Sequence, residues 1–338
     1  MKAAIFEGPN HFEIRQVPDP RPAEDEFVVR VDYCGLCGSD LEIYHGSGMV
    51  MAQGMILGHE FAGEIVEAGP GAARKRLGQK VAVLPALPCG RCDLCTLGRG
   101  ALCRDSTPAL GLKAAGGLAE YVAVPAASAI PLGDLSTRAG ALAEPISVAA
   151  HGVDVSGIQR GQTAIVVGCG PIGALTTQVL RALGAGVVIV SEVSSYRREL
   201  ASRAGATVVV DPAEQDLRQV AREIAGPRGV DFVFECAGSP TGFTQGLSAL
   251  RPTGTMVILS VGRQPMPLVP LHAVVNEYVL KGAFAYTDGL NGGLRLLREG
   301  LVDTDAVVSG ERALDKTGEA FDEMASGRAG KLLVRVGA

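Results

Sequence analysis

Half of the chain's cysteines lie close together in one short stretch. The sequence holds eight cysteines, and the segment CGRCDLCTLGRGALC contains Cys89, Cys92, Cys95 and Cys103. Two residues separate each neighbouring pair among the first three, so a tight turn can aim their thiolates at one ion. The stretch is rich in Gly, Arg and Asp, as exposed loops are, whereas free cysteines are usually buried. We therefore expect a metal here, either a structural zinc ion or an iron–sulfur cluster.

A second set of metal-binding residue types is spread over the first half of the chain. Cys37 lies in CGLCGSD, His59 and Glu60 lie in GHE, and Glu144 lies in AEP. Each segment is a weak signal by itself, because a lone histidine is more often structural and an acid beside glycine often marks a turn. A catalytic zinc ion needs a few N, S or O ligands and one open position. Cys37, His59 and one of the two carboxylates would supply those ligands.

A glycine-rich turn predicts a nucleotide site. The segment GCGPIG follows the apolar strand TAIVV and opens a helix, which makes a GxGxxG pattern specific in a chain with 45 glycines. The first glycine permits the turn, the second lets a pyrophosphate approach the backbone, and the third packs helix against strand. The N-terminus of the helix then holds the phosphates. The residues that we expect around the cofactor at this turn are Gly168, Gly170, Pro171, Ile172 and Gly173.

One carboxylate indicates which dinucleotide binds. Glu192 ends the next apolar strand, where an acid binds the ribose hydroxyls of NAD. The same charge repels the 2′-phosphate of NADP, so NAD is favoured. Arg197 and Arg198 act in the opposite sense, because an arginine near this position can accept that phosphate.

Two folding patterns divide the chain. Residues 1–145 read as short strands between Gly, Pro and Asp, which is typical of a mostly antiparallel β domain. From residue 161, apolar strands alternate with helices, and six such strands predict a doubly wound parallel sheet with helices on both faces. The tail from about residue 285 is too short to fold alone, so we expect it to return to the first domain. The fold class is therefore α/β.

Composition excludes several kinds of partner. The 338 residues are 47% hydrophobic and 20% charged, and the formal net charge is −5, which gives no footprint for nucleic acid or an anionic membrane. The longest uncharged stretch near the middle, residues 163–180, holds glycines, a proline and polar residues, so we interpret it as a strand and helix. The first residues, MKAAIFEGPN, lack the apolar core of a signal peptide. We expect a cytoplasmic, reduced protein that binds neither nucleic acid nor membrane.

The order of these segments carries a resemblance along essentially the whole chain. CGLCGSD, GHE, the four cysteines, GGLAEY (116–121), EPISV (144–148) and GCGPIG follow one another as in the zinc-containing medium-chain dehydrogenase family. The chain resembles the polyol, threonine and butanediol dehydrogenases more than the liver-type alcohol dehydrogenases. The resemblance implies a GroES-like catalytic domain over 1–145 with a structural zinc lobe at 86–105. It also implies a Rossmann NAD-binding domain over 146–284 and a C-terminal segment, 285–338, that returns to the catalytic domain.

The resemblance also implies roles for individual residues. Cys37 and His59 match catalytic zinc ligands and Glu60 matches the ligating acid of the polyol branch, while Glu144 matches an acid that holds the zinc-bound water or serves as an alternate ligand. The four clustered cysteines match the structural zinc site, which makes two zinc ions per chain. Ser39 would lead the substrate proton toward His45 or Glu42. Two segments, VGR and AFA, match backbone that meets the nicotinamide, and the positions that we single out in them are Val261, Ala283 and Ala285.

The implied activity is hydride transfer from a secondary alcohol, such as a polyol, diol or hydroxy-amino compound, to NAD, reversible as ketone reduction, in a homo-oligomer (dimer or tetramer). Two positions depart from the family pattern. Glu42 replaces a histidine of many relatives, and Ala285 replaces an arginine of sorbitol dehydrogenases, which weakens the case for sorbitol itself.

Two other functions remain open. The same fold could serve as a non-catalytic nucleotide-binding or sensory protein, or as a zinc-free quinone or enoyl reductase. The set of Cys37, His59 and Glu60 disfavours both, because neither function needs a metal with an open position.

Overall fold

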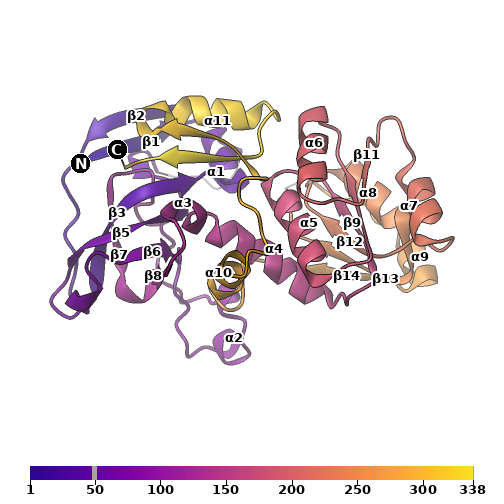
Figure 1. Ribbon diagram of the computed structural model, residues 1–338, viewed down its shortest axis with the longest axis horizontal. Coiled ribbons are helices and arrows are strands. Elements are labelled where there is room, and N and C mark those ends of the chain that lie inside the picture. The colour runs from indigo at the N-terminus through magenta and orange to yellow at the C-terminus, as the bar shows by residue number, and fades with distance from the viewer. Residues whose placement is uncertain (48–51, 263, 338) are drawn as a thin grey trace.

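The molecule consists of two parts that lie side by side. The computed structural model describes residues 1–47, 52–262 and 264–337. Figure 1 shows a mostly β part that holds both chain ends, next to a part in which helices cover a central sheet. This arrangement confirms the expected α/β fold class, with an antiparallel domain and a parallel domain. Within the described residues, no helix is both long enough and apolar enough to span a bilayer.

The first part is built around a seven-stranded sheet in the order β15-β16-β3-β5-β6-β8, with β7 also paired to β3. All of its neighbours are antiparallel except β15 and β16, which run parallel. A small sheet, β2-β1-β4, packs beside it. The strands of the two sheets are β1 (Lys2–Gly8), β2 (His11–Gln16), β3 (Glu26–Gly35), β4 (Met55–Ile56), β5 (Glu60–Ala68), β6 (Lys80–Val83), β7 (Tyr121–Pro125), β8 (Ala129–Pro131), β15 (Val308–Ala313) and β16 (Lys331–Arg335).

Short helices connect these strands, and two of them lie next to candidate metal-binding residues. The helix α1 follows β3 directly, and α2 lies in a loop that projects away from the sheet in Figure 1. The C-terminal helices lead the chain back, and β16 pairs with β3 so that Val334 lies opposite Cys34. The helices of this part are α1 (Gly38–Tyr44), η1 (Arg74–Arg76), α2 (Asp93–Thr96), η2 (Gly100–Leu102), η3 (Ala126–Ser128), α3 (Thr137–Gly140), α10 (Asn291–Arg298), η4 (Leu314–Lys316) and α11 (Thr317–Ala325).

The second part is a six-stranded parallel sheet in the order β11-β10-β9-β12-β13-β14. The strand order reverses beside β9, and a crevice for ligands forms at the carboxyl ends of the strands where such a reversal occurs. Its elements are α4 (Ala143–Ser156), β9 (Thr163–Val167), α5 (Pro171–Leu183), β10 (Val187–Ser191), α6 (Ser195–Arg203), β11 (Val208–Val210), α7 (Leu217–Ala225), β12 (Val230–Glu235), α8 (Pro240–Ala249), β13 (Leu250–Ile258), α9 (Pro270–Asn276) and β14 (Val279–Gly282).

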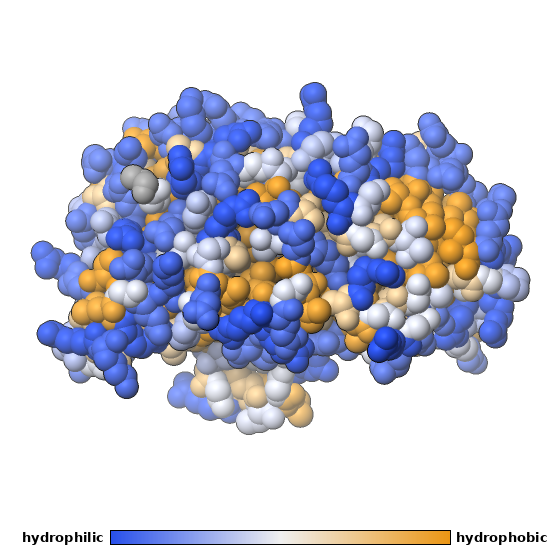
Figure 2. Space-filling model, viewed as in Figure 1, coloured by the Kyte–Doolittle hydropathy of each residue, from blue (hydrophilic) through white to orange (hydrophobic). Residues whose placement is uncertain are grey.

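Both faces of this sheet are covered, as the continuous apolar strands predict. Ala164 and Val166 of β9 belong to a core shared with α4 and α5, whereas Ile165 and Val167 belong to a core shared with α7 and α8. Successive side chains of a strand point to opposite faces, so each face needs its own helical layer. Figure 2 shows hydrophilic side chains over most of the visible face, with apolar ones gathered where the two parts meet and over the second part.

The glycine turn after β9 depends on two different properties of glycine. Gly168 has φ of +85°, a conformation that side chains other than glycine rarely adopt. Gly173 lies in the first turns of α5, where an added Cβ would collide with the carbonyl oxygen of Gly168. The close approach of α5 to β9 therefore requires glycine at both positions.

We predict that Gly173→Ala lowers the free energy of unfolding by about 1–3 kcal/mol, because the helix must move away from the turn. Gly170→Ala is the matched control, since Gly170 has φ of −67° and nothing within 4 Å of an added Cβ. Its stability should change by no more than about 0.5 kcal/mol. Urea unfolding measures both values, and equal losses in the two variants would contradict the packing argument.

Candidate active site

The end of β3 and the start of β5 bring three candidate ligands together. Gly35 pairs in register with Glu60, so Cys37, two residues beyond Gly35, lies beside His59 and Glu60. One ligand atom from each of these three residues lies within 4.8 Å of the other two. His59 and Glu60 are buried and Cys37 is half-buried. Thiolate, imidazole and carboxylate are all zinc ligands, so the site can hold that ion.

A buried aspartate lies behind His59, and the sequence analysis did not single it out. Asp40 lies in α1 with no exposed surface, and its Oδ1 is 3.3 Å from Nδ1 of His59. Its Oδ2 accepts the backbone N–H of Cys37. Burial disfavours a charged His59, but the charges of Asp40 and Cys37 outweigh it and raise the pKa of His59 well above its usual value. A carboxylate in this position orients a metal-binding imidazole. The position of Asp40 three residues after Cys37 was the available signal.

Glu60 also has a partner that the sequence analysis missed. Lys331, the first residue of β16, is buried, and its Nζ donates to Oε1 and Oε2 of Glu60 at 2.8 and 2.6 Å. A third bond runs from Nζ to the carbonyl oxygen of Leu36 at 2.9 Å. Burial lowers the pKa of Lys331, but the negative charges of Glu60 and Cys37 raise it more, so the ammonium is retained. One charged residue at the start of the apolar strand KLLVR was the only hint in the sequence.

Glu144 lies close by but apart from the cluster of three. It belongs to the first turn of α4 and is not among the residues whose ligand atoms lie within 4.8 Å of one another. Burial raises the pKa of Glu144 to about 7; the charge of His59 lowers it, and that of Glu60 raises it. A carboxyl group with such a pKa can exchange a proton near neutral pH.

The residues expected to carry the proton are separated along α1. The hydroxyl of Ser39 donates to Sγ of Cys37 at 3.3 Å, at the N-terminal end of the helix. His45 is the exposed C-terminal cap of the same seven-residue helix, which places it roughly 10 Å away along the axis. The structure therefore brings Ser39, but not His45, to the candidate ligands. Glu42 lines a pocket on the side of α1 that faces the second part.

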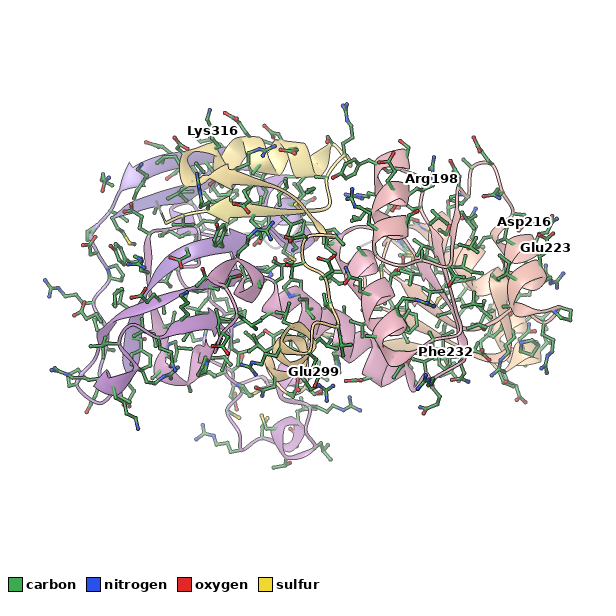
Figure 3. The ribbon with its side chains drawn as sticks, in the orientation of Figure 1. Arg198, Asp216, Glu223, Phe232, Glu299 and Lys316 are labelled. Atoms are coloured by element: carbon green, nitrogen blue, oxygen red, sulfur yellow. The ribbon has the colours of Figure 1, made fainter. Side chains whose placement is uncertain are left out.

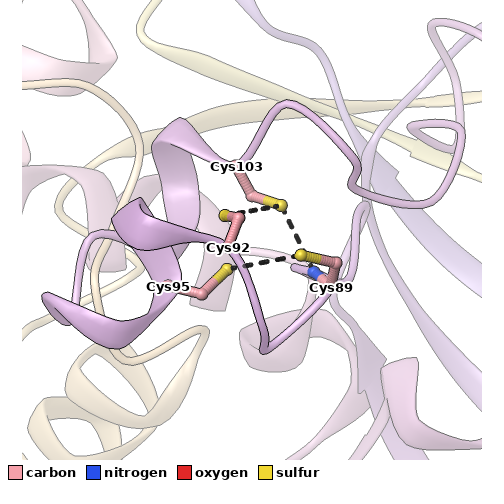
Figure 4. A group of neighbouring side chains, drawn as sticks. All are labelled: Cys89, Cys92, Cys95 and Cys103. Atoms are coloured by element: carbon pink, nitrogen blue, oxygen red, sulfur yellow. Dashed lines mark hydrogen bonds between the residues drawn. The ribbon is translucent and has the colours of Figure 1, made fainter.

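The four clustered cysteines meet in the projecting loop (Figure 4). Sγ of Cys89 lies 3.9 Å from that of Cys95, and Sγ of Cys92 lies 3.8 Å from that of Cys103. Four sulfurs around a tetrahedral zinc ion, at about 2.3 Å each, lie about 3.8 Å apart. Backbone N–H groups of Arg91 and Cys92 lower the pKa of Cys89 to about 6, which favours its thiolate. This spacing suits one ion better than a cluster of several iron atoms.

Glu192 lies where the cofactor ribose is expected. It is buried; its Oε2 accepts the N–H of Cys169 within the glycine turn at 2.7 Å, and its Oε1 accepts the N–H of Ser194 at 2.8 Å. Gly170 caps α5, and Pro171 is the first residue of that helix, with Ile172 and Gly173 following in its first turn. The N–H groups of this helix start therefore face the crevice at the carboxyl ends of the strands.

The two arginines near Glu192 are held by other groups. Nε of Arg197 donates to the carbonyl oxygen of Ala329 at 3.3 Å. Arg198, labelled in Figure 3, donates to the carbonyl oxygens of Glu192 and Val193 and forms an ion pair with Asp211 at 2.9 Å. Among the described residues, neither guanidinium forms an ion pair with the Glu192 carboxylate.

A pocket of about 390 Å³ separates α1 from the loops that follow β12 and β13. Its walls include Ser47 on the side of the first part and Gly238 and Gly262 on the other. A buried carboxylate that the sequence analysis also missed ties the two loops together. Glu235 accepts the N–H groups of Ala237 and Gly238 through Oε1 and the hydroxyl of Ser260 through Oε2.

The expected nicotinamide segments lie at the same edge of the sheet. Val261 is exposed, and the N–H of Ala283 donates to the carbonyl oxygen of Ile258 at 3.0 Å. Ala285 has φ of +51°, a strained value for a residue with a side chain, and such strain often accompanies binding sites. Arg263, the last residue of the VGR segment, lies outside the described residues.

The donor sets satisfy the requirements of two zinc ions. The cluster at Cys37 offers one thiolate, one imidazole and one carboxylate, and it leaves room for a further ligand. Among the described residues, the buried Nδ1 of His59 and Oδ1 of Asp40 lack a well-oriented hydrogen bond, as expected where a cation would organise them. The four cysteines offer a closed set of sulfurs.

Known proteins match this chain along its length. The family model for the alcohol dehydrogenase GroES-like domain matches residues 23–134. The family model for the zinc-binding dehydrogenase matches residues 171–299. Sorbitol dehydrogenase of Bacillus subtilis (strain 168) is 33% identical over 331 residues, which cover 95% of this chain and 93% of that protein. L-threonine 3-dehydrogenase of Pyrococcus abyssi (strain GE5 / Orsay) is 32% identical over 335 residues, covering 95% and 94%. A crystal structure of a candidate zinc-binding dehydrogenase from Sinorhizobium meliloti 1021, bound to NADP, has a TM-score of 0.92 at 35% identity and covers 99% of both chains.

These matches decide between the functions left open by the sequence. The two curated relatives are dehydrogenases, and the zinc-binding dehydrogenase match begins at Pro171, where α5 starts, and covers most of the parallel sheet. A non-catalytic nucleotide-binding protein is therefore not favoured, and neither is a zinc-free reductase. The protein is an oxidoreductase that belongs to the zinc-containing medium-chain dehydrogenase family, in the branch of the polyol and threonine dehydrogenases.

Proposed function

We propose that this enzyme transfers a hydride from a secondary alcohol to NAD, with Cys37, His59 and Glu60 as the ligands of a catalytic zinc ion. The observation that carries the proposal is the cluster of these three residues, with buried Asp40 behind it. The pocket between the two parts of the molecule is lined by Glu42, about one helical turn beyond Ser39 on α1, so a cofactor in this pocket would lie near the proposed metal site. The four cysteines of the projecting loop hold a second, structural zinc ion.

We assign a different role to each residue around the cluster. When bound, zinc supplies a Lewis acid that stabilises negative charge on the alcohol oxygen. Asp40 orients His59, and the Lys331 ammonium balances the charge of Glu60. Ser39 is placed to pass on the alcohol proton, since its hydroxyl already reaches Cys37. Glu144, whose pKa is about 7, would either hold the zinc-bound water and take up that proton or act as an alternate ligand. From Ser39 the proton would pass onward through hydroxyl groups to Glu42 or His45, which lie further along α1.

The substrate class follows from the branch of the family. A polyol, a diol or a hydroxy-amino compound, each with a secondary hydroxyl, suits the proposed site. Sorbitol itself is disfavoured, because Ala285 offers no guanidinium to a distal hydroxyl. The reaction runs in reverse as reduction of the corresponding ketone.

A panel of such alcohols, with NAD and a record of reduced-cofactor absorbance, tests this function. We expect about two zinc ions per chain by elemental analysis. Cys37→Ala should abolish turnover and remove one ion with little effect on the melting temperature, whereas Cys92→Ala should remove the other ion and lower the melting temperature first. Iron in place of zinc, or the opposite effects of the two cysteine variants, would contradict the assignment.

Ser39→Ala should lower kcat by about 10²–10⁴-fold.

Glu192 supports NAD as the cofactor. Its carboxylate can accept both ribose hydroxyls, and a 2′-phosphate would meet it at close range. Arg197 and Arg198, which could offset that repulsion, are bonded to Ala329 and Asp211. The relative from Sinorhizobium meliloti was solved with NADP, which makes cofactor choice an open comparison within the family.

We predict that kcat/KM with NAD exceeds that with NADP by at least roughly tenfold, or about 1.4 kcal/mol. Glu192→Ala should lower this ratio, because the variant binds NAD more weakly and no longer repels the 2′-phosphate of NADP. Steady-state kinetics of wild type and variant with both cofactors measure the effect. Equal use of both cofactors by the wild type would remove Glu192 from its proposed role.

We propose that two copies associate through β14, as a dimer or as the unit of a tetramer. β14 is the edge strand of the parallel sheet, and α9 beside it has no buried residue. Leu271, Val274 and Val275 of α9 are each more than half exposed. An exposed edge strand beside apolar side chains is a surface that another chain can cover.

The oligomer should therefore depend on α9. Val274→Asp should shift the molecular mass in solution to that of one chain, because a charge would be buried at the interface. Leu97→Asp is the matched control, since Leu97 is equally exposed but lies on the cysteine loop. Light scattering measures both, and a monomeric wild type would exclude the assembly.

The proposal also includes the domain boundaries of the chain and the location of the protein in the cell. We assign 1–145 and 285–338 to the catalytic domain, with the zinc lobe at 86–105, and 146–284 to the NAD-binding domain. The pairing of β16 with β3 supports this division. A cytoplasmic location suits the lobe, because a reducing compartment keeps its thiolates available for zinc.

A further inference from the structure

All three N–H donors of the Lys331 ammonium form hydrogen bonds, which hold the side chain in one position. An ammonium carries three donors, and those of Lys331 are taken by Oε1 and Oε2 of Glu60 and by the carbonyl oxygen of Leu36. The side chain is 1% exposed, so water cannot replace any of these partners. Moving the ammonium away would leave a buried carboxylate unpaired, which is costly. A displacement of the Lys331 backbone therefore displaces the carboxylate of Glu60 as well.

The residues just before Lys331 are attached to the other part of the molecule. The carbonyl oxygen of Gly327 accepts the hydroxyl of Ser194 at 3.1 Å, and that of Ala329 accepts Nε of Arg197 at 3.3 Å. Gly330 packs so closely on Leu200 that an added Cβ would lie 3.1 Å from its Cδ2. The turn that joins α11 to β16 thus rests on α6.

The attachment point on α6 is also the ribose end of the proposed cofactor site. The N–H of Ser194 donates to Oε1 of Glu192 at 2.8 Å, while its hydroxyl caps α6 and contacts Gly327. A nucleotide that takes up the Glu192 carboxylate must therefore readjust the start of α6. Only four peptide units separate Gly327 from Lys331, so a displacement at one end has little slack to be absorbed.

We propose that the turn over residues 327–330 and Lys331 couple the ribose-binding site to the metal site, with Lys331 as a positioning residue for Glu60. This inference rests on the proposed function, since it requires both a nucleotide at Glu192 and a metal at Cys37, His59 and Glu60. Metal at the cluster fixes Glu60 and, through Lys331 and the turn, the start of α6. A preorganised ribose site then binds the adenosine part of the cofactor more tightly, and the effect is reciprocal.

Adenosine diphosphate is the probe that isolates this coupling, because it fills the ribose and phosphate site but carries no nicotinamide that could touch the metal. Its Kd is measured by calorimetry on protein with both zinc ions and on protein from which the catalytic ion alone has been dialysed. We expect binding to be about fivefold tighter with the catalytic ion present, at the lower end of typical coupling between sites. The readout needs no turnover.

Two variants cut the connection at its two ends. Lys331→Met removes the bond to Glu60, and Ser194→Ala removes the bond to Gly327 but leaves the buried ion pair intact. Lys331→Met should bring the ratio of the two Kd values to about one, and Ser194→Ala should lower it, because the bond from Arg197 to Ala329 remains. Ser136→Ala is the matched control, because it removes an equivalent helix cap from α3 and should keep the fivefold ratio. If Lys331→Met does not fold, Ser194→Ala carries the test alone.

A ratio of one in the wild type, or an unchanged ratio in Ser194→Ala, would overturn the coupling while leaving the proposed function in place. Failure of the probe to bind at all, or of the cluster to take up zinc, would instead overturn the proposed function and this inference with it.

Discussion

The charges buried where β3 meets β5 set the conditions for the rest of the structure. Asp40, Glu60 and Lys331 have almost no exposed surface, and His59 very little. Taking an ion out of water costs several kcal/mol, which is recovered only when opposite charges lie in good geometry. Each charge here has a partner, since Lys331 faces Glu60 and Asp40 faces Nδ1 of His59. The fold must therefore bring α1, β5 and β16 together accurately, although they are far apart in the sequence.

That requirement explains why the chain returns from the parallel sheet to the sheet in which it began. β16 lies next to β3, which places Lys331 under the loop that carries Leu36 and Cys37. The same return path passes over α6, so the chain itself joins the proposed metal ligands to the proposed ribose site at Glu192. In the proposed enzyme, substrate, metal and cofactor would be assembled at the boundary between the two parts, which share one apolar core.

The features predictable from the sequence are those with a local signature. The six alternating strands, the glycine turn before α5 and the grouped cysteines each depend on spacing within a short segment, and the structure contains each of them. Lys331 was not predictable, because its partner Glu60 is 271 residues away and only the register of β16 against β3 brings them together. Asp40 carried a local signal that was overlooked. The relay to His45 stays a prediction, and the structure adds that this residue caps the C-terminal end of α1. The bonds of Arg197 and Arg198 depend on backbone oxygens, which leave no trace in residue type.

The large sequence separation between Glu60 and Lys331 has a consequence for synthesis on the ribosome. Glu60 emerges early, and with Phe61 and Ile65 it belongs to a strand whose neighbours β3 and β6 are also made early. Its cationic partner is translated 271 residues later, roughly 15–55 s at ordinary elongation rates. Throughout that interval the carboxylate must stay hydrated or protonated, so this edge of the first sheet cannot close to its final density. A nascent chain released before Lys331 would contain the Glu60 carboxylate in the first sheet and no cation to pair with it.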